Sequence, residues 1–148
     1  MHFEFSSLIP APVEEVFAFH ERDDVLALLT PPWQTVDVVR REGGLEKGAV
    51  VEFVIHAGPF RVRWLAEHIE YEKNRLFTDI QVKGPFRSWR HRHVFEVDAG
   101  GTRLTDSIDF AFPGGKPAEW TAGWVARWQL RRMFAYRHQV TRANCTAL

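Results

Sequence analysis

The stretch that decides the fold is PFRSWRHRHVFEVDAGGTRLTDSIDFAF, residues 85–112. In its first half Trp89, His91, His93 and Phe95 occupy every second position, with arginine or valine between them. Alternate side chains of an extended strand share a face, so the two aromatic rings and two imidazoles point one way and the arginines the other. The Ala-Gly-Gly turn and the alternating run after it predict an antiparallel hairpin.

The same alternation recurs along much of the chain, separated by turn residues rich in Gly, Pro and Asn. We expect strands in 2–9, 34–41, 49–58, 59–72, 75–84, 85–98 and 102–112. Two short helices are expected in 11–20 and 23–32, the second stopped by Pro31-Pro32, and one long helix in about 118–143. Sequential strands joined by short turns predict an antiparallel meander.

The composition is that of an ordinary globular protein and excludes several classes. The 148 residues are 45% hydrophobic and predict one domain over 1–148. The 19 basic and 19 acidic side chains cancel, which argues against a nucleic-acid-binding protein. We expect no integral membrane segment and no signal peptide, and therefore a cytoplasmic location. The one cysteine, Cys145, excludes an internal disulfide, and we expect it at a frayed terminus.

The order of these elements resembles the helix-grip fold of the START-like, or SRPBCC, superfamily, which includes birch-pollen-allergen-like proteins. The segments IPAPVEEVFAFH, LLTPPW, LFTDIQVKGPFRSWRHRHVFE, TRLTDSIDFAFPGG and LRRMFAYRH are similar to its bacterial branch of polyketide cyclase/dehydratase-like, ligand-binding proteins. The resemblance covers nearly the whole chain. It implies an α+β fold in which a seven-stranded antiparallel sheet wraps around a long C-terminal helix and leaves a cavity between them.

Extending the alternation to the other strands predicts which side chains face that cavity. Asp79 and Asp106 are expected on the strands that flank His91 and His93, so that carboxylates and imidazoles pair across the sheet. We take these four residues as the candidate catalytic set. The candidate ligand-binding residues are Trp64, Phe77, Gln81, Trp89, Phe95, Met133 and Arg137.

The four polar residues allow three interpretations at this stage: a structural hydrogen-bond network, a set that orients a ligand, or an acid–base pair for aldol-type cyclisation or dehydration. A His-x-His chelate is a fourth, but its third ligand is conjectural, and we predict no metal. Arg137 is expected to face the sheet and to pair with Asp79, Asp106 or an anionic ligand group. His138 is expected off that stripe, and no Ser-His-Asp nucleophile pattern is apparent.

The residues and the resemblance together predict a binder of a small hydrophobic or aromatic molecule, with cofactor-independent cyclase/dehydratase-like chemistry if it is an enzyme. One alternative is a non-catalytic carrier of a lipid or quinone. Another is a protein-interaction module, since Trp124 and Trp128 fall nearly opposite the predicted inner stripe of the long helix, which consists of Ala126, Leu130, Met133, Arg137 and Val140. Packing of these tryptophans under a loop is the interpretation that we favour, and their use in a homo-oligomer is a further alternative.

Overall fold

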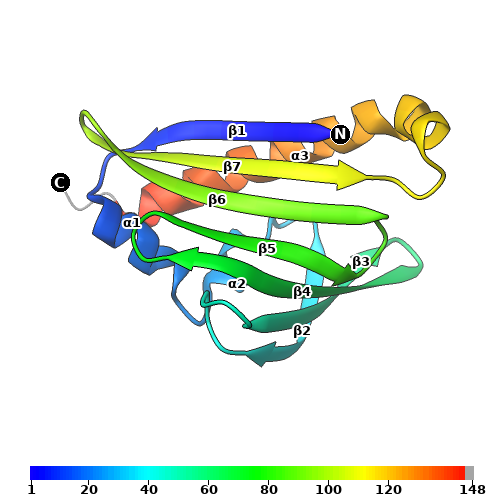
Figure 1. Cartoon of the computed structure of the whole chain (residues 1–148), viewed down its shortest axis with the longest axis horizontal. Coiled ribbons are helices and arrows are strands. Elements are labelled where there is room, and N and C mark those ends of the chain that lie inside the picture. The colour runs from blue at the N-terminus through cyan, green and yellow to red at the C-terminus, as the bar shows by residue number, and fades with distance from the viewer. Residues whose placement is uncertain (146–148) are drawn as a thin grey trace.

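The fold is a single antiparallel sheet with helices on one face, seen in a computed structural model that describes residues 1–145 (Figure 1). Its seven strands lie in the order β1-β7-β6-β5-β4-β3-β2. They are β1 (His2–Ile9), β2 (Thr35–Glu42), β3 (Val50–Ala57), β4 (Phe60–Glu72), β5 (Leu76–Lys83), β6 (Ser88–Asp98) and β7 (Gly101–Ala111). β2 to β7 form the predicted meander, and the N-terminal strand β1 pairs with the last strand, β7.

Three helices cover the concave side of the sheet. They are α1 (Val13–His20), α2 (Val25–Leu29) and α3 (Lys116–Cys145). The long helix α3 lies behind β1, β7 and β6 (Figure 1). Helices α1 and α2 cover one end of the sheet, next to the C-terminal half of α3. This arrangement confirms the predicted α+β helix-grip fold.

Tight turns fix the register of the central hairpin. Asp98 pairs with Gly101, so that only Ala99 and Gly100 form the β6–β7 turn, and Gly100 has a φ of 88° that favours glycine. The resulting register places His93 opposite Asp106. Because a slip of one residue would send every side chain to the other face, this turn determines which groups meet inside.

The predicted faces of β6 are confirmed. Trp89, His91 and Phe95 are buried and His93 is nearly so, whereas the arginines between them are exposed. The inner rings join two apolar clusters, one under α1 around Phe17, Phe77 and Phe95, and one under α3 around Trp64, Trp89 and Phe134. The polar side chains of the inner face lie between these apolar regions.

The buried face of α3 is rotated from the predicted one. Its buried residues are Gly123, Leu130, Phe134, His138, Thr141 and Cys145, whereas Met133, Arg137 and Val140 are half-buried at its margin. The difference arises because His138 and Thr141, which are polar, take core positions that an apolar stripe does not reveal. The expected frayed end at Cys145 is also wrong, since this side chain is 4% exposed and packs in the cluster under α1.

Candidate functional site

The centre of the polar cluster is Asp106 on β7, which is 4% exposed and faces three histidines. Its Oδ1 lies 2.7 Å from His91 Nε2 and 3.1 Å from His93 Nδ1, and its Oδ2 lies 2.6 Å from His138 Nε2. Burial alone would raise the pKa of Asp106, but these hydrogen bonds hold it well below its usual value. Asp106 is therefore a buried carboxylate that keeps its negative charge.

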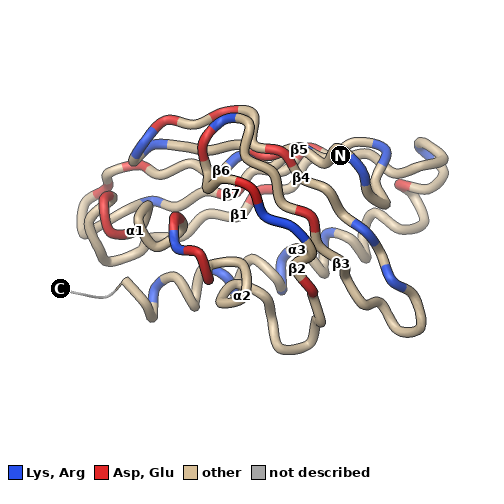
Figure 2. The backbone as a smooth tube through the Cα atoms, turned by 90° about the horizontal axis from the view of Figure 1, so that it is seen from below, with Lys and Arg blue, Asp and Glu red and all other residues tan. Residues whose placement is uncertain are grey.

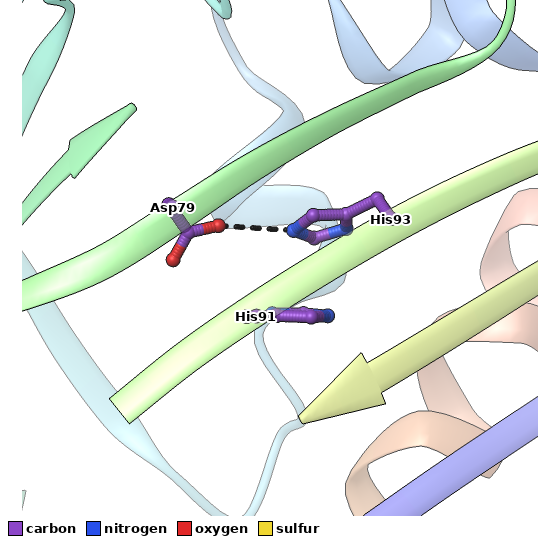
Figure 3. Close-up of side chains that lie close together, drawn as sticks. All are labelled: Asp79, His91 and His93. Atoms are coloured by element: carbon purple, nitrogen blue, oxygen red, sulfur yellow. Dashed lines mark hydrogen bonds and ion pairs between the residues drawn. The ribbon is translucent and has the colours of Figure 1, made fainter. Parts of the chain in front are cut away.

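His93 is held between two carboxylates. Its Nε2 lies 3.0 Å from Asp79 Oδ2 on β5 and its Nδ1 lies 3.1 Å from Asp106 Oδ1 on β7; Figure 3 shows the first contact. A carboxylate only accepts hydrogen bonds, so a carboxylate at each ring nitrogen favours the doubly protonated imidazolium form of His93. Burial lowers the pKa of His93, but the bonds and charges of the two carboxylates outweigh it and the net shift is upward.

His91 differs from His93 although the two rings stack with their centroids 3.6 Å apart. Burial and the neighbouring positive charge of His93 lower the pKa of His91, and the bond to Asp106 only partly offsets them. His91 is thus a neutral imidazole that donates Nε2–H to Asp106. The cluster holds two stacked histidines with opposite pKa shifts, the arrangement expected of an acid paired with a base.

His138 extends the cluster to the edge strand, which corrects the expectation that it lies off the inner face. It is 4% exposed, and its Nδ1 lies 2.6 Å from the Ser7 hydroxyl on β1 while Nε2 donates to Asp106. Ser7, His138 and Asp106 therefore form a hydrogen-bond chain that the sequence pattern did not predict. The sequence does not reveal it because Ser7 and His138 are 131 residues apart and meet only when α3 packs on β1.

Arg137 does not make the predicted pair with Asp79 or Asp106. Its Nε donates to the carbonyl of Leu29 at the end of α2, at 3.3 Å, and its guanidinium lies 5.3 Å from the centroid of the Phe134 ring. Burial lowers its pKa, but a guanidinium remains charged at any physiological pH. Arg137 joins α2 to α3 with a cation that no carboxylate of the described residues contacts directly.

A cavity of about 20 Å³ lies between these groups and the three helices. Six polar side chains line it: His20, His93, Asp106, Arg137, His138 and Thr141. This volume fits one water molecule, whereas sites for drug-sized ligands measure several hundred Å³. The space beside the histidines is thus small and polar rather than the large aromatic hollow expected from the sequence. A second, more open space of about 600 Å³ lies at the other end of β6, lined by Met1, Gln81, Trp89 and Phe110 among others, and does not include the histidines.

The predicted aromatic residues lie in two places relative to this cavity. Phe77 stacks on His93 with ring centroids 4.0 Å apart, and Phe95 packs beside Phe77 at 5.9 Å. Trp64 and Trp89 instead contact each other at 5.0 Å in the cluster under α3, together with the half-buried Met133. Phe77 and Phe95 therefore adjoin the histidines, whereas Trp64 and Trp89 belong to the apolar cluster under α3.

Gln81 serves a different contact from the one expected. Its Nε2 donates to the carbonyl of Phe86 at 2.8 Å, and its Oε1 accepts from the Phe86 N–H at 3.1 Å. Both bonds secure the loop between β5 and β6, beyond the last paired residues of these strands. Gln81 therefore does not reach the histidines.

Two further histidines adjoin the cluster and were not predicted. His20 at the end of α1 donates Nδ1–H to the carbonyl of Val16 at 2.8 Å, and burial lowers its pKa to about 4. His68 on β4 pairs with Asp79 in the strand register, and burial lowers its pKa as well. His20 could have been suspected from its place on the apolar face of α1, at the spacing of Val13, Val16 and Phe17.

Asp79, His91 and His93 are also the residues that could hold a metal ion. One ligand atom from each lies within 4.8 Å of the others, and two imidazoles with a carboxylate suit zinc (Figure 3). Binding would require His93 to lose the proton on Nε2 and its bond to Asp79. The protonated arrangement thus competes with a metal, and the absence of a metal stays a prediction.

Comparison with known proteins agrees with this architecture. Residues 9–135 match the family described as polyketide cyclase / dehydrase and lipid transport. The chain belongs to this family. A search of curated proteins finds no match, whereas many solved structures are similar, and the allergen-like ones among them place this START-like domain in the helix-grip class.

Three of the similar structures indicate how widely the fold is shared. The protein TTHA0849 from Thermus thermophilus has a TM-score of 0.76 at 19% identity, covering 99% of this chain and 98% of that one. Ara h 8.0201 has a TM-score of 0.70 at 17% identity, with 97% and 98% covered. A nucleoside-diphosphate sugar epimerase from Corynebacterium glutamicum has a TM-score of 0.71 at 28% identity, but the match covers 95% of this chain and only 28% of that protein.

Proposed function

We propose that this START-like protein binds a small hydrophobic or aromatic molecule between its sheet and α3, and acts on it by cofactor-independent acid–base chemistry of the cyclase/dehydratase type. One observation carries the proposal: His93 is fixed between two carboxylates and lines an internal cavity beside Arg137. A cluster of buried titratable groups with opposite pKa shifts is typical of functional sites. The family to which the chain belongs makes a ligand the expected occupant.

The two stacked histidines divide the chemistry. An aldol cyclisation or a dehydration needs a base to remove a proton next to a carbonyl and an acid to protonate the oxygen that gains charge or leaves. His93, which lines the cavity, is the acid once a ligand oxygen replaces one of its two carboxylate contacts, and the neutral His91 stacked on it is the base once the helices part. Asp79 and Asp106 orient the rings and stabilise the positive charge, as buried carboxylates do beside a catalytic histidine.

Arg137 is the group that receives the developing negative charge. It lines the same cavity as His93, and its guanidinium is free of a carboxylate partner among the described residues. A preformed cation in a site with little water stabilises an enolate or carboxylate oxygen far more than it would in solution. We therefore expect a ligand that carries a carbonyl or carboxylate next to an apolar body.

Ligand access requires the helices to part, because the present cavity holds one water molecule. The five-residue helix α2 closes the cavity with Leu29, whose carbonyl accepts the Arg137 bond. Moving α2 outward breaks the hydrogen bond between Arg137 and Leu29 and removes Leu29 from the apolar cluster that contains Phe77 and Phe95. Short helices with few contacts are the elements that open at low cost.

Non-catalytic carriage of a lipid or quinone is the second candidate, since the family description includes lipid transport. The two functions differ in what the histidines do. A carrier holds its ligand by the apolar walls, so replacing His91 and His93 with glutamine leaves affinity unchanged. An enzyme loses turnover in the same variants by about 10²-fold or more, the contribution typical of a general acid or base.

The first experiment is native mass spectrometry of the purified protein, followed by identification of any bound small molecule by its mass. The proposal predicts an apolar compound with a carbonyl or carboxylate group, whose binding weakens at least tenfold in Arg137→Gln. His56→Gln is the matched control, because His56 pairs with Asp37 at the outer end of β3, outside the cluster. Equal affinities of both variants would contradict the proposed site. A cytoplasmic location remains our prediction.

A further inference from the structure

Four of the six tryptophans lie on the surface of the protein. Trp120, Trp124 and Trp128 on α3 are 86%, 71% and 56% exposed, and Trp33, just after α2, is 51% exposed. Burying apolar rings of this size is favourable, and a group of exposed large apolar side chains marks a surface that binds a partner or a membrane. The alternative that Trp124 and Trp128 pack under a loop is therefore wrong.

These side chains form one continuous surface with arginines. Trp120, Trp124 and Trp128 are spaced four residues apart and follow one side of the helix, and Arg132 continues the row. The Arg132 guanidinium lies 4.4 Å from the Trp33 ring centroid and 5.0 Å from that of Trp128, which joins α3 to the segment after α2. We call this surface the Trp–Arg face; it consists of Trp33, Trp120, Trp124, Trp128, Arg127, Arg131 and Arg132, all exposed.

The charge of the chain is concentrated on the same helix. α3 carries six basic residues and one acidic residue, a net charge of +5, so the rest of the neutral chain carries −5. Figure 2 shows basic segments along α3 and most acidic segments elsewhere. Three of the six basic residues, Arg127, Arg131 and Arg132, belong to the Trp–Arg face, which is therefore positively charged.

We propose that the Trp–Arg face docks on the surface of an anionic lipid bilayer. Tryptophan is enriched where a bilayer meets water because its ring is apolar and its N–H is polar. Arginines beside it are attracted to anionic head groups, and a helix with such a face lies flat in the interface. None of the helices within residues 1–145 is long and apolar enough to cross a bilayer, which suits peripheral docking.

A symmetric homodimer through this face fits the charges less well. A two-fold interface would place the Arg127, Arg131 and Arg132 of one copy against the same residues of the other. α3 offers only Glu119 as a counter-charge. Like charges brought together at an interface oppose association, whereas an anionic membrane supplies the missing negative charge.

The proposal is tested by flotation of the intact protein with lipid vesicles, with no added ligand. We expect partitioning into phosphatidylcholine vesicles with ~40% phosphatidylglycerol to exceed that into pure phosphatidylcholine on the order of 100-fold, because each of three arginines contributes about fivefold. Binding should fall as salt rises. Brominated lipids should quench tryptophan fluorescence in the wild type, and much less after Trp120→Ala with Trp124→Ala.

A control variant with the same change in net charge distinguishes docking through the Trp–Arg face from attraction of any basic protein surface to anionic vesicles. The variant Arg127→Gln/Arg131→Gln/Arg132→Gln should lose most of the binding. Arg61→Gln/Arg63→Gln/Arg90→Gln, which removes three exposed arginines of β4 and β6 from the outer side of the sheet, should bind as the wild type does. Equal losses in the two triple variants, or no binding to anionic vesicles at low salt, would overturn the proposal. So would a dimer in sedimentation experiments that Trp120→Ala/Trp124→Ala converts to a monomer.

Discussion

The prediction with the largest expected effect is the replacement of Asp106 by asparagine. The substitution Asp106→Asn would keep the shape of the side chain but remove the charge on which three buried histidines depend, at 2.7, 3.1 and 2.6 Å. The new amide group has one accepting oxygen, so at least one histidine N–H loses its acceptor. Removing one partner from a buried charge network costs about 3–5 kcal/mol, and we expect that loss in the free energy of unfolding at pH 7.

The assay is urea unfolding followed by circular dichroism. With an m-value of about 2 kcal/mol/M, the expected loss moves the midpoint down by roughly 1.5–2.5 M. Asp79→Asn should cost less, because Asp79 accepts a bond from His93 alone among the histidines. Asp109→Asn, three residues along β7 on the outer face, is the control and should change stability by no more than about 0.5 kcal/mol. A loss below about 1 kcal/mol for Asp106→Asn would refute the hub role of this carboxylate.

Three further predictions follow from single contacts. The pKa of His20 is about 4 in the folded protein against 6.5 in the unfolded chain, so unfolding takes up a proton at any pH between 4 and 6.5. The free energy of unfolding should therefore fall by about 3 kcal/mol in total as the pH drops from 6.5 to 4. Urea unfolding at a series of pH values should show a smaller fall for His20→Gln. Gly101→Ala should destabilise the protein by at least about 2 kcal/mol in thermal unfolding, because φ is 148° and the new Cβ would clash with the Ile9 carbonyl. The control is Gly58→Ala, whose Cβ would meet open space, so that this variant should show only the cost of its positive φ. Burial raises the pKa of the Cys145 thiol to about 11, so we expect labelling by a thiol reagent at pH 8 to be far slower in the folded protein than in urea, and equal rates would show that the end of α3 is open.

Much of the sheet could be predicted from the sequence because its determinants are local. The alternation of Trp89, His91, His93 and Phe95 assigns a face, and the two-residue turn at Ala99-Gly100 fixes the register against β7. Together these bring Asp106 to His93 without further information. The short meander turns bring Asp79 to the other side in the same way.

The contributions of the helices could not be predicted to the same extent. The rotation of α3 depends on which side chains the sheet accepts, so His138 and Thr141 occupy buried positions that an apolar stripe assigns to neighbours. Arg137 donates to a backbone carbonyl at the end of α2, and a pattern of side chains in the sequence cannot predict such a contact. Cavity size depends on how closely side chains pack, to a fraction of a side-chain volume.

The most direct test of the account is a ¹⁵N NMR titration of the histidine rings, assigned with single His→Gln variants. If two carboxylates hold His93 as an acid beside a neutral His91, then His93 keeps both ring protons to a pH above 6.5, and His91 loses its second proton below 6.5. A neutral tautomer of His93 at pH 6, or coincident titration of the two rings, would remove the acid from the proposed chemistry.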